Sequence, residues 1–152
     1  AEEAAKVLAA VRGGDGFRVG EIATAPKRRH APPPHTTSTL QQAANSFLKY
    51  SATRTMQIAQ QLYEGIDTGG GPVGLITYMR TDSVNVAAEA QQACREFIGG
   101  AYGPEYVPPK PNFFKSGKTA QEAHEAIRPT DVTRTPEMME QYLDRHQLKL
   151  TR

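Results

Sequence analysis

The sequence predicts a mainly helical α+β domain with a helix-turn-helix-like, winged-helix-like core and one short strand. Two amphipathic helical patterns, over 38–48 and 51–64, are separated by two residues, a spacing typical of a helix-turn-helix geometry. A short apolar run at 75–79 lies between a glycine-rich loop and polar residues, which predicts a strand. The 152 residues are enough for one domain and a piece of another.

Ahead of this core, the sequence predicts a helix over 1–12 and a strand over 17–25. Alanine, leucine and valine recur at helical spacing in the first segment, and Gly13–Gly14 ends it. Phe17 and Val19 supply apolar positions of the expected strand.

The segment 26–35 is predicted to be a linker, because it contains four prolines and a basic run, Lys27–His30. Such a run is usually solvated, although it also suits a polyanionic partner. The linker divides the chain into a partial domain at 1–33 and a larger domain at 34–152.

The two core helices have recognisable N-caps. Ser38 is the expected cap of the first helix, with Gln41 completing a capping box, and Ser51 is the expected cap of the second, which runs to Glu64. Apolar residues at helical spacing predict the buried faces, and these are Leu40, Ala43, Ala44, Phe47, Leu48, Met56, Ala59, Leu62 and Tyr63.

Beyond the strand, a third helix is expected to begin at Ser83 or Asn85 and to end at Gly99–Gly100. A proline-rich loop follows over 101–118, and 119–128 is expected to form one or two helical turns.

Two short helices close the sequence. Thr135 caps one of them, with Pro136 at its first position, and we expect this helix to continue to Leu143. Asp144 caps the other, which we expect to be truncated at Arg152.

Composition narrows the class of protein. The net charge of +2 and the pI near 8.8 are weak evidence for a polyanionic partner. A single cysteine, Cys94, excludes an internal disulfide and fits a reducing cytosol. We expect no transmembrane helix, because no apolar run reaches ~18 residues, and the N-terminus is unlike a signal peptide.

A tyrosine and an arginine define the main candidate site. Tyr78 and Arg80 are two residues apart, so on a strand they would project from the same face. Asp82 and Ser83 lie at an expected helix start, where backbone N–H groups favour an anion. A phenol becomes a good nucleophile at neutral pH only beside positive charge, which Arg80 could supply. The pattern indicates tyrosine attack on a phosphodiester; the alternative is a tyrosine that only packs.

A second candidate pair is His124 and Arg128, which would share one face of the expected helical turns and could bind a phosphate. An ordinary surface helix is the alternative. Arg128 stands where a zinc-protease motif needs a second histidine, so that class is excluded. The carboxylates are scattered along the sequence, so no metal site is expected on this chain. The sequence also lacks the Gly-Lys-Ser/Thr loop that binds nucleotide phosphates, so nucleotide hydrolysis is not expected.

Four blocks of sequence, in the same order, resemble bacterial DNA topoisomerase I of the type IA family. The resemblance implies that the chain contains the tyrosine-bearing domain and that 1–33 belongs to a neighbouring hinge domain. The blocks are Thr37–Ala44, Ala59–Gly65, Ile76–Ser83 and Ala123–Thr130.

The resemblance implies an isomerase that cuts and rejoins single-stranded DNA through a 5′-phosphotyrosine and relaxes negative supercoils. Tyr78 would be the nucleophile, Arg80 would lie at the scissile phosphate, and His124 would lie near the active site. The covalent link keeps the phosphodiester's energy, so no ATP is needed. The residues expected in or near the DNA-contacting pocket are Gln60, Tyr63, Glu64, Asp82, Ser83 and Arg128.

The resemblance also implies parts that this chain does not contain. The acidic cluster that binds Mg²⁺ would lie in a separate N-terminal domain, so the chain alone is expected to be inactive in relaxation. The expected partners are single-stranded DNA and other domains of the same chain, in a monomeric, cytoplasmic, nucleoid-associated bacterial enzyme with no membrane attachment.

Two other functions stay open at this point. A non-catalytic helix-turn-helix DNA-binding module would need basic residues on its second helix, where only Arg54 is basic. A purely structural adaptor would bury Tyr78.

Overall fold

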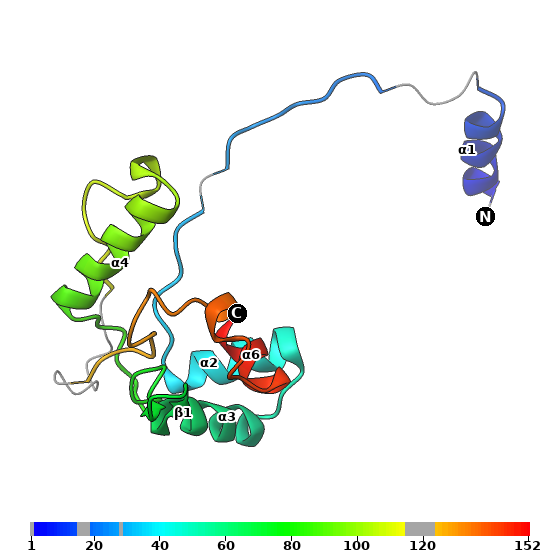
Figure 1. Cartoon of the computed structure of the whole chain (residues 1–152). Helices are drawn as coiled ribbons and strands as arrows, with labels where there is room; N and C mark the ends of the chain where they lie inside the picture. The colour runs from blue at the N-terminus through cyan, green and yellow to red at the C-terminus, as the bar shows by residue number, and fades with distance from the viewer. Residues whose placement is uncertain (1, 15–18, 28, 115–123) are drawn as a thin grey trace. The chain divides into compact units, whose positions relative to one another are not determined.

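The computed structural model describes residues 2–14, 19–27, 29–114 and 124–152. The chain divides into two units, Ala1–Ala31 and Pro32–Arg152, and each is considered by itself (Figure 1).

In the described residues of the first unit, the one helix is α1 (Glu2–Arg12), which confirms the helix expected over 1–12. None of its residues is buried, and its apolar side chains face solvent. The strand expected over 17–25 is wrong for residues 19–25, which have irregular backbone, whereas Phe17 lies outside the described residues. A strand needs a hydrogen-bonded partner, and Val19 and Ile22 are 79% and 77% exposed.

The second unit is built around helices, which confirms the mainly helical class. Figure 1 shows α2, α3 and α6 grouped together, with α2 and α3 in contact and α6 packed on α3. Their bounds are Thr37–Ala43, Ala52–Glu64 and Arg145–Thr151. The buried side chains between them include Leu40, Ala44, Ile58, Ala59 and Leu62.

The capping box predicted at Ser38 and Gln41 is wrong by two residues. Thr36 is the N-cap of α2, and it exchanges hydrogen bonds with Thr39. By contrast, Ser51 caps α3 as predicted and accepts a hydrogen bond from the Arg54 N–H at 3.2 Å.

The first core helix ends in a wider turn. Ala44–Leu48 forms a π-helical turn, η1, which ends at Lys49 in the left-handed region with φ 60°. A π turn changes the phase of a helix, and Phe47, expected to be buried, is 84% exposed.

A small hairpin follows α3 where a flexible loop was expected. Strand β1 (Ile66–Asp67) pairs antiparallel with β2 (Pro72–Val73), with Ile66 opposite Val73. The hairpin adds a small β component to the helical unit; the winged-helix-like detail stays a prediction.

The strand predicted at 75–79 is wrong. This segment is irregular and forms a single-residue bridge from Ile76 to Pro129. The helical turns predicted at 119–128 are also wrong for 124–128, which have no regular secondary structure and bridge back through Ile127 to His35; residues 119–123 lie outside the described chain. These segments satisfy their polar groups through long-range contacts in place of a local helix or a regular strand.

The remaining helices differ from the prediction mainly in their bounds. Helix α4 (Ala88–Ala101) has Ala87 as N-cap instead of Ser83 or Asn85. Within the long loop, Pro104–Tyr106 forms a 3₁₀ turn, η2.

The caps predicted at Thr135 and Asp144 are confirmed. They begin α5 (Pro136–Met139), which is shorter than expected, and α6. In the described residues, no helix is long and apolar enough to cross a membrane.

Candidate functional site

Tyr78 lies on an irregular segment at the surface. Its side chain is 48% exposed, and its ring packs edge-on against Tyr63 of α3, with 5.3 Å between centroids. Aromatic edge contacts of this kind restrict ring orientation while leaving part of the ring exposed. This exposure contradicts the structural-adaptor alternative, which required a buried Tyr78.

Arg80 lies between two surface hollows. The first, which we call the His124 hollow, brings Arg80, Asp82 and His124 together with the start of α2; its remaining lining residues are Thr37, Ser38, Gln41 and Thr81. The second, the Gln60 hollow, lies along α3 and is lined by Arg80, Thr53, Met56, Gln57, Gln60, Gln61 and Met79. A guanidinium that reaches two open hollows is well placed to meet an anionic backbone running across them.

The α3 residues expected near DNA form a short row. The Gln60 side-chain amide donates a hydrogen bond to the Glu64 carboxylate one turn later, and Tyr63 contacts Tyr78. Three of the predicted residues thus lie on one helix beside the tyrosine, as the spacing of 60, 63 and 64 allows.

Two predicted residues are not brought to this surface. Ser83 is fully buried, and no helix begins there, so the expected anion site at a helix start beside Tyr78 is wrong. Arg128 points its guanidinium at Glu125, 2.7 Å away, and at the Pro129 carbonyl oxygen. The helical pairing of His124 with Arg128 is wrong as well, because their segment is not helical.

Thr37 ties α2 to the segment that carries Arg80. Its hydroxyl donates to the Met79 carbonyl oxygen at 2.7 Å and accepts from the Thr81 N–H at 2.9 Å. Its own N–H donates to the Thr81 carbonyl oxygen at 2.9 Å. These bonds fix the backbone on both sides of Arg80.

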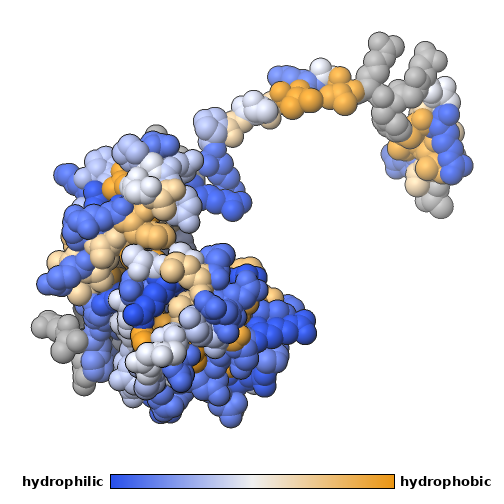
Figure 2. Space-filling view, in the orientation of Figure 1, coloured by the Kyte–Doolittle hydropathy of each residue, from blue (hydrophilic) through white to orange (hydrophobic). Residues whose placement is uncertain are grey.

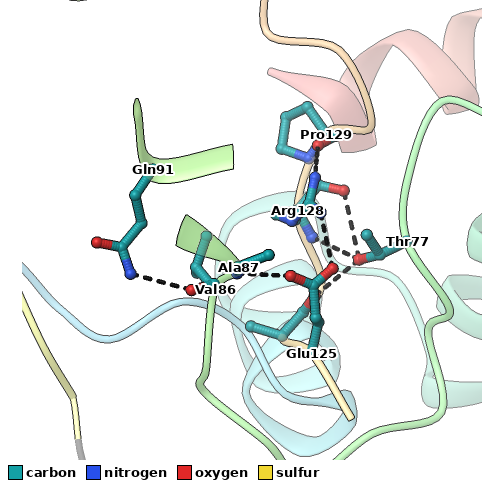
Figure 3. A network of polar contacts seen from close by, with 8 residues as sticks. Thr77, Val86, Ala87, Gln91, Glu125, Arg128 and Pro129 are labelled. Atoms are coloured by element: carbon teal, nitrogen blue, oxygen red, sulfur yellow. Dashed lines mark hydrogen bonds and ion pairs between the residues drawn. The ribbon is translucent and has the colours of Figure 1, made fainter. Parts of the chain in front are cut away.

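Thr77, the residue before Tyr78, is hydrogen-bonded to the segment 126–128 (Figure 3). Its hydroxyl donates to the Ala126 carbonyl oxygen at 2.7 Å and accepts from the Arg128 N–H at 3.0 Å. Its N–H donates to the Arg128 carbonyl oxygen at 2.9 Å. Two threonines therefore anchor the tyrosine and arginine segment to chain that is more than 40 residues away in sequence.

Sequence reasoning missed four residues at this site. Ser38 and Gln41 were expected only as a helix cap, although they belong to the first family-like block, and they line the His124 hollow. Thr37 and Thr77 lie inside quoted blocks, but no local pattern indicates hydroxyl bonds across such sequence distances.

Replacing Thr37 with valine is expected to destabilise the chain by about 1–3 kcal/mol, because the N–H of Thr81 and the carbonyl of Met79, both buried residues, lose their partner. Urea unfolding followed by circular dichroism measures the change. The T37S variant keeps the hydroxyl and should lose much less; equal losses for both variants would contradict the hydrogen-bond account.

The described residues offer no metal site. Across 2–14, 19–27, 29–114 and 124–152, no group of three or more histidine, cysteine, aspartate or glutamate side chains could hold an ion. The acidic cluster expected elsewhere in the whole enzyme stays a prediction.

The family model and the known proteins that this chain matches are DNA topoisomerases. A family model described as DNA topoisomerase matches residues 1–150. DNA topoisomerase 1 of Helicobacter pylori is 48% identical over 137 residues, which cover 90% of this chain and 19% of that protein. DNA topoisomerase 1 of Campylobacter jejuni is 44% identical over 150 residues, 98% of this chain and 21% of that protein.

A solved structure agrees with the sequence relatives. Full-length topoisomerase I from Thermotoga maritima matches with a TM-score of 0.69 and 47% identity, over 82% of this chain and 19% of that one. The chain thus spans about a fifth of the length of the relatives it matches. Because the family match covers nearly every residue, this chain belongs to the bacterial type IA DNA topoisomerase family.

Proposed function

We propose that, in the full-length enzyme, Tyr78 cleaves single-stranded DNA by transesterification. The phenol gives up its proton as its oxygen bonds to phosphorus, the bond from phosphorus to the 3′ oxygen breaks, and that oxygen takes a proton. The products are a 5′-phosphotyrosine and a free 3′-hydroxyl, and the reverse step rejoins the strand. The observation that carries this proposal is the exposed Tyr78, followed two residues later by Arg80, which shares a hollow with His124.

The side chains of the candidate site suit distinct roles. Arg80 would bind the scissile phosphate and stabilise the charge that develops on its oxygens. His124, across the same hollow, would donate a hydrogen bond or move a proton. Tyr63 would limit the orientations of the Tyr78 ring through their edge contact.

The row of α3 residues beside Tyr78 supports a path for the DNA strand. We propose direct contacts for Gln60, Tyr63, Glu64 and Asp82, with the Tyr63 ring offering a base a stacking surface. Ser83 is buried and the Arg128 guanidinium is paired with Glu125, so we propose that they act on DNA only indirectly.

The rest of the proposal concerns the whole enzyme. Mg²⁺ would be held by acidic residues in another domain, ATP would not be used, and residues 1–33 would belong to the hinge domain. The exposed apolar residues Val7, Leu8 and Val11 of α1 would then pack against the rest of that domain. We propose a monomeric, cytoplasmic, nucleoid-associated enzyme with no membrane attachment.

Trapping the covalent intermediate tests this function. Full-length enzyme is incubated with end-labelled single-stranded DNA, denatured and digested, and the DNA-linked peptide is sequenced. The expected attachment residue is Tyr78. A non-catalytic helix-turn-helix module, the alternative function, would give no adduct; attachment to another residue would refute the assignment of the nucleophile.

The 152-residue chain by itself is expected to leave supercoiled plasmid unchanged in the presence of Mg²⁺, because four-fifths of the length of its relatives is absent. Agarose gel electrophoresis of the topoisomers measures this, with full-length enzyme as the positive control. Relaxation by the chain alone would show that it contains a complete active site.

A further inference from the structure

The carboxylate of Glu125 joins two elements that are far apart in sequence (Figure 3). One oxygen accepts a hydrogen bond from the Ala87 N–H at 2.6 Å, and the other accepts from the Arg128 guanidinium at 2.7 Å. Ala87 is the N-cap residue of α4 and makes no side-chain cap bond of its own. Glu125 thus supplies a negative charge at the start of α4, where the helix dipole favours it.

The Glu125–Arg128 pair is partly shielded from solvent. The side chains are 31% and 21% exposed, respectively, so salt screens the pair less than a surface ion pair. The other described contact of the guanidinium is the Pro129 carbonyl oxygen at 2.9 Å, and its buried Nε has no hydrogen-bond partner in the described chain. Without Glu125, a half-buried cation would therefore lose the anion that compensates it.

The residues on either side of Glu125 belong to the candidate active site or contact its neighbours. His124, which precedes Glu125, lines the hollow with Arg80. Ala126, which follows it, donates its N–H to the Asn85 carbonyl oxygen at 2.8 Å and accepts from the Thr77 hydroxyl at 2.7 Å. The segment 124–128 is thus anchored to Asn85, which lies ahead of α4 in the sequence, and to Thr77, the residue before Tyr78.

We propose that Glu125 is a positioning residue for DNA cleavage. Its carboxylate binds the N–H of Ala87 at the start of α4 and the guanidinium of Arg128, and these two contacts lock the segment 124–128 onto α4. The lock sets His124 at the hollow and holds the Thr77 anchor beside Tyr78. This inference rests on the proposed function, because it assigns Glu125 a part in the same cleavage step.

The test compares E125A and E125Q with wild type in the full-length enzyme. Single-turnover cleavage of labelled single-stranded DNA and equilibrium binding of the same strand are measured separately. We expect E125A to slow cleavage ~10- to 100-fold, because small displacements of reacting groups are costly, while DNA affinity stays within twofold. E125Q should lose less, since its amide oxygen still accepts from the Ala87 N–H.

A matched pair elsewhere in the chain supplies the control. Asp131 and Arg134 have the same three-residue spacing, but their side chains are 42% and 37% exposed and lie 3.4 Å apart. D131A should therefore cleave at the wild-type rate. In a double-mutant cycle, E125A/R128A should lose no more than E125A alone if the two residues act as one unit.

Each outcome decides the inference. Cleavage by E125A within twofold of wild type would overturn it, as would a loss of DNA affinity that accounts for the whole effect. If E125A does not fold, the E125Q variant tests the inference in its place. Severalfold slower cleavage at unchanged DNA affinity supports the positioning role of Glu125, and an unchanged cleavage rate overturns it. Failure of the proposed function is distinguishable, because wild-type enzyme would then form no adduct at Tyr78.

Discussion

Replacing Tyr78 with phenylalanine in the full-length enzyme is expected to abolish the covalent DNA adduct. The substitution removes the oxygen that we propose bonds to phosphorus, and it keeps the ring that packs against Tyr63. The loss should therefore be complete for cleavage while the fold and the affinity for single-stranded DNA change little. Denaturing gel electrophoresis of labelled DNA measures the adduct, and circular dichroism checks the fold.

A second tyrosine serves as the matched control. Tyr106 is 65% exposed and lies in η2, away from both hollows. The Y106F variant should form adduct at the wild-type level. Adduct that persists in Y78F would contradict the assignment of the nucleophile.

Replacing Arg80 with alanine is expected to slow cleavage ~10²- to 10³-fold, the usual effect of removing one group that stabilises transition-state charge. Arg80 is exposed where the two hollows meet, so its removal should cost little stability. Single-turnover cleavage gives the rate, and unfolding in urea gives the stability.

Two further variants define the role of Arg80. R80K keeps the charge and loses the planar fork, so it should recover only part of the rate. R145A removes an exposed arginine at the start of α6 and should cleave normally. A similar loss in R80A and R145A would indicate a general effect of charge in place of a specific phosphate contact.

Helices with local signals were predictable from sequence. Helix α3 has a serine cap and apolar residues on one face, and both features depend on residues within a few positions of one another. The caps at Thr135 and Asp144 are of the same kind. Such elements were confirmed because their main interactions are close in sequence.

Segments without regular partners were not predictable. Residues 75–79 and 124–128 have patterns that suit a strand and a helix, yet both are irregular or extended. Their backbone groups form hydrogen bonds with each other, with His35 and with Asn85, so the partners are separated by tens of residues. Periodicity carries no information about such pairing.

By itself, the sequence determined the residue types at the candidate site, their resemblance to a family and the helices with local caps. The tertiary structure alone decided which of these side chains meet: Arg80, Asp82 and His124 share one hollow, whereas Ser83 is buried and Arg128 turns to Glu125. The physical reason is that the site is assembled by hydrogen bonds from Thr37 and Thr77 to chain more than 40 residues away. Only the folded chain brings those partners within bonding distance.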